Sequence, residues 1–258
     1  MTGSKRIGCI VQERDRHLLR ELGVMRVINR EQAQIITEFP SVRRANRRLL
    51  ALTRAGMLRR IFVPNTVFGE KAVYTLSSAG AALVDSRLPG LALRQSRFGA
   101  SPFLLHRLEV NEIYLTVKYR RLPKPDMRLS RWISFREPLT QAIPLTPDGY
   151  FEIANEGASR AMFLEVDLGT ESMPVWTKKT QLYLQMALSG SFTELFRQQQ
   201  FRVLVIATTE RRLQHIRSVI AKSTDKVFWI STFDDIKLHG FWSSIWRRPT
   251  GDQRLQLI

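Results

Sequence analysis

The stretch Pro-Asp-Gly-Tyr-Phe (147–151), followed by Met-Phe-Leu-Glu-Val-Asp-Leu-Gly-Thr (162–170), decides the fold predicted for the second half of the chain. Side chains alternate along a strand, so Glu165 and Asp167 leave it on the same side. A turn between the two segments predicts a hairpin, which brings Asp148 toward these carboxylates. Three carboxylates in one place repel one another, and a fold keeps them together mainly to hold a hard cation. The stretch therefore predicts a Mg²⁺ or Mn²⁺ site with Asp148, Glu165 and Asp167 as metal ligands.

The charge of the chain indicates a polyanionic partner. The 258 residues have a net charge of +17 and an apolar fraction of 44%, enough for a globular core in one large or two small domains. Residues 1–100 carry 18 Lys and Arg against 7 Asp and Glu, whereas residues 101–258 carry 22 against 16. A protein this basic usually meets nucleic acid, and the alternative is that the charge serves solubility alone. The uneven distribution of charge predicts two modules with different functions.

Cysteine usage and hydropathy favour a cytoplasmic protein. The single cysteine, Cys9, excludes a disulfide framework and cysteine-based zinc sites. The N-terminus lacks the apolar core of a signal peptide, and no run of about 18 apolar residues occurs. We expect no membrane partner.

The first ninety residues have the pattern of three short helices and a hairpin. The helices are predicted at 14–22, from the N-cap candidate Asn29, and at 42–55, and the strand-like runs lie at 58–63 and 72–76, with a further helix at 77–84. This is the layout of a winged helix-turn-helix, in which the third helix fits the major groove and the hairpin touches the neighbouring backbone.

The third helix and the first strand are rich in arginine. Seven arginines and no acid lie between residues 43 and 60. Arginines hold phosphates or read guanine edges. The alternative is a solvated basic helix on a winged helix that binds protein. The residues predicted to contact double-stranded DNA are Arg43, Arg44, Asn46, Arg47, Arg48, Arg54, Arg59 and Arg60.

The predicted domain boundary lies in a segment with Pro, Gly and arginine. We assign residues 1–88 to the DNA-binding domain, 89–102 to a linker, 103–236 to the second domain and 237–258 to a tail. The second domain opens with a largely apolar helix at 103–122. Glu112 lies at the edge of its apolar surface and needs a partner, either an arginine or the carboxylate cluster.

The rest of the second domain alternates strands and helices. The expected strands are 128–135, the 148–168 hairpin, 201–207 and 227–231, and the expected helices start at Ser172 and Arg211. The tail contains Trp242 and Trp246, which dock on the body or on a partner. The predicted fold class is α+β or α/β, with the winged helix-turn-helix followed by an α/β domain.

The second domain has an acid on its first helix, Pro-Asp at the entry to one strand and Glu-x-Asp on the next strand. With these features, its order of helices and strands resembles the PD-(D/E)xK restriction-endonuclease-like fold. Over residues 13–232 the chain resembles the replication-relaxation family of bacterial plasmid and mobile-element proteins. The matching phrases are His106 with Val-Asn-Glu (110–112), Pro-Asp-Gly-Tyr-Phe (147–151), Phe-Leu-Glu-Val-Asp-Leu-Gly-Thr-Glu-Ser (163–172), and Lys179 with Tyr183.

The resemblance implies a role in plasmid replication, DNA relaxation or transfer, and a location at the plasmid or nucleoid. In nucleases of this fold, acids at the places of Asp148 and Glu165 hold Mg²⁺, which activates a water. The chain departs from the pattern because Asp167 stands where the usual lysine does. Lys178 or Lys179 could supply that cation. The alternative is a degenerate fold in which Glu165 and Asp167 form salt bridges with arginines.

Other chemistries fit the sequence less well. The four histidines are far apart and form no His-x-His pair, and no Gly-x-x-x-x-Gly-Lys-Ser/Thr loop occurs. The predicted catalytic set is Asp148, Glu165, Asp167, Lys179 and Glu112. We expect a DNA-binding replication or mobilisation factor that nicks DNA, and the rival is a non-catalytic initiator or transcriptional regulator. Replication or transfer proteins and a second copy of the chain are the further partners compatible with this role.

Overall fold

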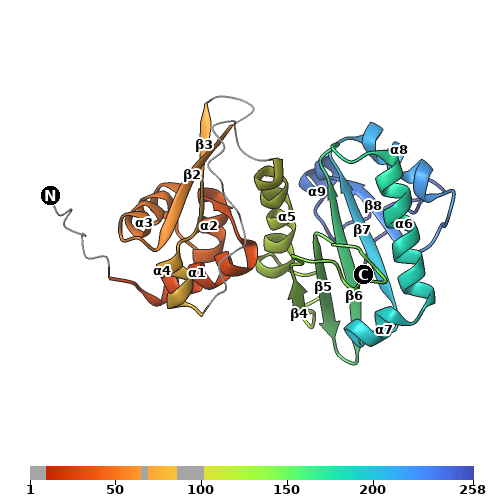
Figure 1. Ribbon diagram of the computed structural model, residues 1–258, viewed down its shortest axis with the longest axis horizontal. Coiled ribbons are helices and arrows are strands. Elements are labelled where there is room, and N and C mark those ends of the chain that lie inside the picture. The colour runs from red at the N-terminus through yellow and green to blue at the C-terminus, as the bar shows by residue number, and fades with distance from the viewer. Residues whose placement is uncertain (1–9, 65–68, 86–101) are drawn as a thin grey trace. The chain divides into compact units, whose positions relative to one another are not determined.

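The computed structural model describes residues 10–64, 69–85 and 102–258. The chain has a mixed α+β fold and divides into two compact units, Met1–Arg120 and Arg121–Ile258 (Figure 1). The predicted linker at 89–102 lies, apart from its last residue, outside the described residues. The division falls after the helix that was expected to open the second domain, and each unit is described by itself.

Unit 1, residues 1–120, combines short helices with a small antiparallel sheet of order β1-β3-β2. Its elements are α1 (Glu13–Met25), β1 (Ile28–Asn29), α2 (Arg30–Thr37), α3 (Val42–Arg54), β2 (Leu58–Pro64), β3 (Glu70–Leu76), α4 (Ser78–Leu83) and α5 (Pro102–Tyr119). The predicted helices and the hairpin are confirmed. Strand β1 was not predicted because two residues are too short to show a pattern.

Local sequence explains where the helices of unit 1 begin and end. The side chain of Asn29 accepts a hydrogen bond from the backbone N of Gln32 at 2.8 Å, so the predicted N-cap of α2 is confirmed. Ser41 caps α3 by accepting from Arg44 N at 3.3 Å. Helix α3 ends just before Gly56, whose φ of 79° is a left-handed conformation that glycine adopts without strain.

Helix α5 packs within unit 1 because its polar side chains saturate carbonyls there. Asn111 Nδ2 donates to the carbonyl oxygen of Val27 at 2.7 Å, and Arg107 Nε donates to that of Met25 at 3.2 Å. Both side chains are buried. Buried polar groups are stable only when they are hydrogen-bonded, so these contacts hold α5 beside the turn between α1 and β1.

Unit 2, residues 121–258, is built on a five-stranded mixed sheet of order β4-β5-β6-β7-β8. Strands β4, β5 and β6 are antiparallel neighbours, whereas β6, β7 and β8 run parallel. The elements are β4 (Arg128–Ile133), β5 (Gly149–Asn155), β6 (Ala158–Asp167), α6 (Met173–Leu188), α7 (Ser191–Phe196), β7 (Phe201–Ala207), α8 (Glu210–Ile220), β8 (Phe228–Thr232) and α9 (Phe233–His239).

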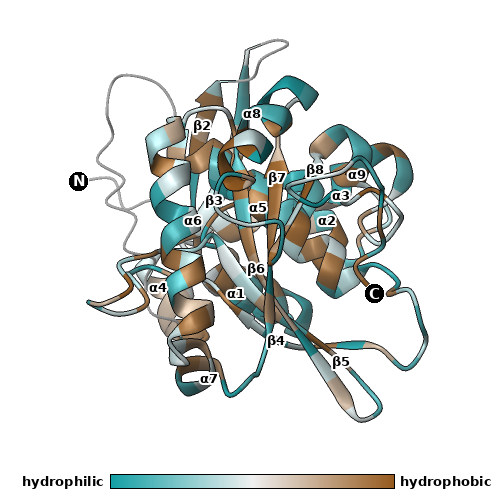
Figure 2. Cartoon of the chain, turned by 90° about the vertical axis from the view of Figure 1, so that its right-hand side faces the viewer, coloured by the Kyte–Doolittle hydropathy of each residue, from teal (hydrophilic) through white to brown (hydrophobic). Residues whose placement is uncertain are grey.

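The main core of unit 2 lies between one sheet face and helices α6 and α8. Phe163 of β6 and Val205 of β7 pack there against Tyr183 of α6 and Ile216 of α8, and all four are fully buried. Strand β7 is hydrophobic along most of its length, with Arg202 as the exception, as expected for a strand covered on both faces (Figure 2). The parallel β6, β7 and β8 begin at one end of the sheet and finish at the other, which defines an amino end and a carboxyl end.

The tail folds onto unit 2. Trp246 is fully buried and its Nε1 donates to the carbonyl oxygen of Phe241 at 2.9 Å. Arg247 forms a backbone bridge with Ile230 of β8. Of the two expectations for the tail tryptophans, docking on the body is therefore the one that Trp246 follows. Within the described residues, no helix is both long enough and apolar enough to cross a membrane.

Candidate functional site

The acids of β6 lie at the carboxyl end of the sheet. Glu165 and Asp167 are each 1% exposed, and both side chains contact residues of α6, so they share the helix-covered face as the alternation predicts. Asp148 directly precedes β5, and its Oδ2 accepts a hydrogen bond from the backbone N of Val166 at 2.7 Å. The hairpin therefore brings Asp148 beside the end of β6, as predicted.

Lys179 of α6 forms the centre of the first carboxylate group. Its Nζ lies 2.8 Å from Glu165 Oε2 and 2.7 Å from Glu171 Oε1. Tyr183 donates its hydroxyl to Glu165 Oε1 at 2.6 Å. Asp148 is close enough to act electrostatically on both Glu165 and Lys179. We name Asp148, Glu165, Glu171, Lys179 and Tyr183 the lysine-centred cluster.

Burial controls the protonation of this cluster. Burial raises the pKa of Glu165 from its ordinary 4.5 to about 7. The positive charge of Lys179 opposes this rise, and the negative charge of Asp148 adds to it. The pKa of Lys179 is raised despite burial, because Glu165, Glu171 and Asp148 favour its charged form. The ammonium thus stays charged, while Glu165 can hold or release a proton near neutral pH.

Asp167 belongs to a separate arrangement. Arg212 of α8 binds it with two nitrogens, at 2.7 Å to Oδ1 and 2.7 Å to Oδ2. Trp176 Nε1 donates to Oδ2 at 2.9 Å, and Gly169 N donates to Oδ1 at 2.7 Å. Burial alone would raise the pKa of Asp167, but these bonds outweigh it and lower the pKa. Asp167 is therefore fixed as an ionised partner of Arg212.

The structure does not bring the three predicted metal ligands into one group. Within the described residues, no set of three or more His, Cys, Asp and Glu side chains is arranged to hold a metal ion. Asp167 is turned to Arg212, as in the alternative of acids paired with arginines. Glu165 pairs with a lysine.

Glu112, which was expected to face the carboxylate cluster, has a partner within unit 1. Its Oε1 accepts a hydrogen bond from Gln32 Nε2 at 2.7 Å, within unit 1. The partner that a carboxylate at the edge of an apolar helix requires is thus a glutamine of α2. It is neither an arginine nor a second acid.

Helix α3 carries an exposed row of arginines. Arg47 and Arg54 lie four and eleven positions after Arg43 along the helix, so the three share one side. These three and Arg44 are exposed, and none pairs with an acid in the described part of the chain. Arg59 and Arg60 of β2 are exposed as well, and Arg60 stacks 5.0 Å from the ring of Phe62.

Two residues predicted to contact DNA have partners within unit 1. Arg48 Nε donates to Asp15 Oδ1 at 2.8 Å, and its Nη2 also contacts Oδ2 of the same carboxylate. Asp15 is 1% exposed, so Arg48 neutralises a buried acid and links α3 to α1. Asn46 accepts a hydrogen bond from the hydroxyl of Tyr74 at 3.2 Å. Both interactions depend on the fold of unit 1, which the arginine pattern alone does not reveal.

Sequence reasoning missed Glu171 and Arg212 as members of the site. Glu171 lies inside the quoted phrase that ends at Ser172, so its position was available as a signal. Arg212 stands at the start of α8, forty-five residues beyond Asp167, and no local pattern connects the two.

Comparison with known proteins gives one match. No curated protein and no solved structure matches the chain significantly. The family model described as replication-relaxation matches residues 19–197, more than half of the chain, including the arginine-rich α3 and the lysine-centred cluster. The chain belongs to the replication-relaxation family.

Proposed function

We propose that this chain is a double-stranded-DNA-binding protein that acts in the replication or mobilisation of a plasmid or another mobile element. The order α1, α2, α3 and the β2–β3 hairpin supports the interpretation of unit 1 as a winged helix-turn-helix, with α3 entering the major groove. The observation that carries the proposal is the exposed row Arg43, Arg47 and Arg54, which no acid neutralises in the described part of the chain. The phosphates of DNA would neutralise these charges.

Charge reversal on α3 tests this proposal. Arg43→Glu and Arg47→Glu, made separately, should each weaken binding to a labelled duplex by about tenfold and lower the salt slope by about one. Fluorescence anisotropy across a series of salt concentrations measures both. The matched control is Arg20→Glu, an equal charge change at an exposed arginine of α1. Equal weakening in all three variants would mean that net charge, and not α3, governs binding.

Metal-dependent nicking of DNA is a second candidate function. The specific observation in its favour is that Glu165, with its pKa raised to about 7, lies beside Asp148 and Lys179 at the carboxyl end of the sheet. A carboxylate has about four acceptor sites, and Tyr183 and Lys179 use two of those on Glu165. Asp148 and Glu165 would hold Mg²⁺ or Mn²⁺, which would activate a water for attack on phosphate. Lys179 would face the phosphate.

The rival is a scaffold that binds DNA without cutting it. In that case the Lys179 ammonium takes the place of a metal, since it already contacts Glu165 and Glu171. Cleavage of supercoiled plasmid with Mg²⁺ or Mn²⁺ separates the two candidates. Nicking that is lost in Asp148→Asn and Glu165→Gln supports the enzyme. Retained DNA binding without nicking in the wild type supports the scaffold.

Glu152→Gln provides the matched control for the cleavage assay. Glu152 lies on the same sheet, is 8% exposed and accepts a hydrogen bond from Tyr150 at 2.6 Å, much as Glu165 does from Tyr183. A nicking protein should keep its activity in this variant. If Glu152→Gln abolished nicking as fully as Glu165→Gln, the loss would report damage to the sheet and not the removal of a metal ligand.

A further inference from the structure

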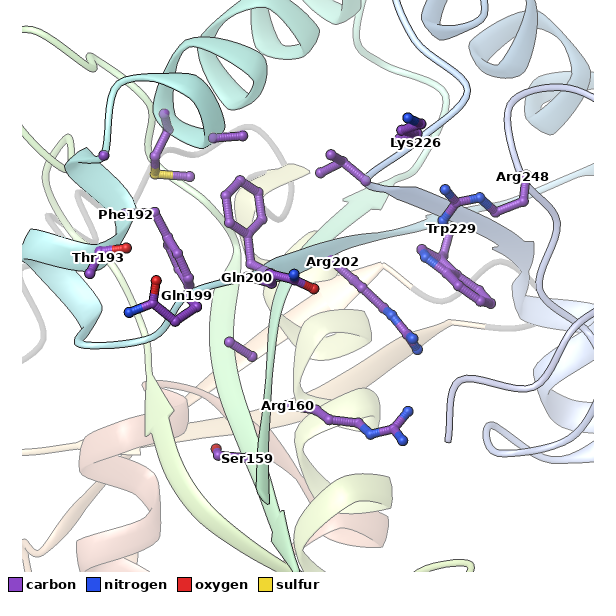
Figure 3. Close-up of a pocket in the computed structure, with 16 residues that line it drawn as sticks. Ser159, Arg160, Phe192, Thr193, Gln199, Gln200, Arg202, Lys226, Trp229 and Arg248 are labelled. Atoms are coloured by element: carbon purple, nitrogen blue, oxygen red, sulfur yellow. The ribbon is translucent and has the colours of Figure 1, made fainter. Parts of the chain in front are cut away.

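A pocket opens at the amino end of the sheet in unit 2, the end opposite the carboxylates (Figure 3). Its volume is about 630 Å³, within the range of small-molecule sites. Residues near the starts of β6, β7 and β8 line it, together with residues of α6 and α7. Neither the lysine-centred cluster nor Asp167 contributes to its lining.

One side of the pocket is strongly cationic. Arg160, Arg202, Lys226 and Arg248 all line it, around the indole of Trp229. The guanidinium carbons of Arg202 and Arg248 lie 4.3 Å and 5.0 Å from the Trp229 ring centroid. The strand register explains this gathering, because Arg202 is opposite Met162 and Trp229 is opposite Leu204. We name Arg160, Arg202, Lys226 and Arg248 the cationic wall.

The positive charge of this wall is not balanced within the pocket. Its lining contains no Asp or Glu. Arg160 and Arg202 both donate to the backbone carbonyl of Leu257, which is a neutral group. Burial, with repulsion from Arg160 and Arg248, lowers the pKa of Arg202. Burial also lowers the pKa of Arg248, although Asp225 opposes that change. An anion in the pocket would relieve this repulsion.

The other side of the pocket is neutral. Gln199 and Gln200 are exposed; Gln199 lies near Phe192 and Thr193, away from Arg248, and Gln200 lies between Gln199 and Arg202 in this view (Figure 3). Side-chain amides offer donors and acceptors that match the edge of a heterocycle. A ligand that spans the pocket would therefore place a negative group at the wall and a polar ring at the glutamines.

We propose that this pocket binds a nucleotide, with its phosphate at Arg160, Arg202 and Arg248 and its base toward Gln199 and Gln200. The nucleotide is either free or part of a single DNA strand, since both present the same phosphate and base. The site lies in unit 2 and does not depend on DNA binding by α3.

Titration of the full-length chain tests the proposal with two probes, deoxyadenosine monophosphate and a twelve-residue oligothymidylate. Arg160→Gln and Arg248→Gln should each weaken binding by about tenfold, the effect of losing a hydrogen bond to a charged group. Arg211→Gln is the control, since Arg211 is exposed on α8 and does not line the pocket. Circular dichroism and unfolding curves verify that each variant is folded.

The two probes separate the two sources of the nucleotide. Binding of the mononucleotide that both pocket variants weaken assigns a free-nucleotide site. Binding of the oligonucleotide alone, weakened by the same variants, assigns a strand site. The proposal is overturned if neither probe binds, or if folded Arg160→Gln and Arg248→Gln bind both probes as the wild type does. It is also overturned if the mononucleotide does not bind and Arg47→Glu, on α3, is the variant that abolishes oligonucleotide binding while the pocket variants do not.

Discussion

The two ends of the sheet in unit 2 carry opposite charges and differ in how those charges are balanced. At the carboxyl end, Lys179 pairs with Glu165 and Arg212 pairs with Asp167. At the amino end, Arg160 and Arg202 both donate to the neutral carbonyl of Leu257, and neither pairs with an acid among the described residues. Glu165 and Asp167 are buried and need partners, which the protein supplies, whereas Arg160 is exposed and Arg202 is half-buried. In the proposed site, a bound anion balances the positive charge at the amino end. The charges at the carboxyl end therefore stabilise the fold, whereas those at the amino end bind a ligand.

The largest effect should come from breaking the balance at the carboxyl end. Arg212→Met leaves Asp167 buried without its cation and should lower the free energy of unfolding by about 3–5 kcal/mol. Urea unfolding followed by circular dichroism measures this change. Arg211→Met, at the neighbouring exposed position, should change it by less than about 0.5 kcal/mol. A similarly small change in Arg212→Met would mean that this pair does not stabilise the fold.

A smaller effect should appear in the pH dependence of stability. The pKa of Glu165 is raised from 4.5 to about 7, so its proton is held more tightly in the folded state. The stability it contributes is present at low pH and is lost as the pH rises from about 4.5 to about 7. Asp167 behaves in the opposite way, because its pKa is lowered and its contribution is lost as the pH falls below its ordinary 3.8.

Glu165→Gln makes the contribution of Glu165 measurable. The substitution removes the titrating group, so the free energy of unfolding of the wild type relative to the variant should fall by up to about 3 kcal/mol across that window. Urea unfolding at intervals from pH 4.5 to pH 8 gives both curves. Parallel curves for the two proteins would show that Glu165 has the same pKa in the folded and unfolded states.

Much of the fold could be predicted from local sequence. The alternation of β6, the Asn29 cap and the continuous apolar run of β7 each depend on neighbouring residues, and each was confirmed. The alternation also indicated correctly that Glu165 and Asp167 share a face. The placement of Asp148 beside them followed from a single hairpin, which joins strands that are neighbours in the sequence and can therefore be predicted from it.

What local sequence could not predict was the partner of each charge. Asp167 meets Arg212 across forty-five positions, and Glu112 meets Gln32 across eighty. Such pairs depend on how elements pack, and strand or helix periodicity contains no information about that. The cationic wall was missed for the same reason: the parallel register brings Arg160 of β6 and Arg202 of β7 together, and the antiparallel bridge between Arg247 and Ile230 brings in Arg248 from the tail.

The smallest effect on stability should come from removing a charge at the amino end. Arg248→Gln takes away a cation whose pKa burial lowers, so without ligand the free energy of unfolding should stay within about 0.5 kcal/mol of the wild type or rise. A loss comparable to that of Arg212→Met would show that the amino end holds the fold as the carboxyl end does, and the contrast between them would disappear.

Adding ligand sharpens the same measurement. At a concentration of deoxyadenosine monophosphate ten times its Kd, the wild type should gain about 1.4 kcal/mol in the free energy of unfolding, because the nucleotide binds only the folded state. Arg248→Gln, with affinity about tenfold lower, should gain only about 0.4 kcal/mol at that concentration. Equal gains in the two proteins would place the bound nucleotide away from the cationic wall. If only the wild type and the Arg211→Gln control gained this stability, the nucleotide would be bound at the unbalanced positive charge of the amino end.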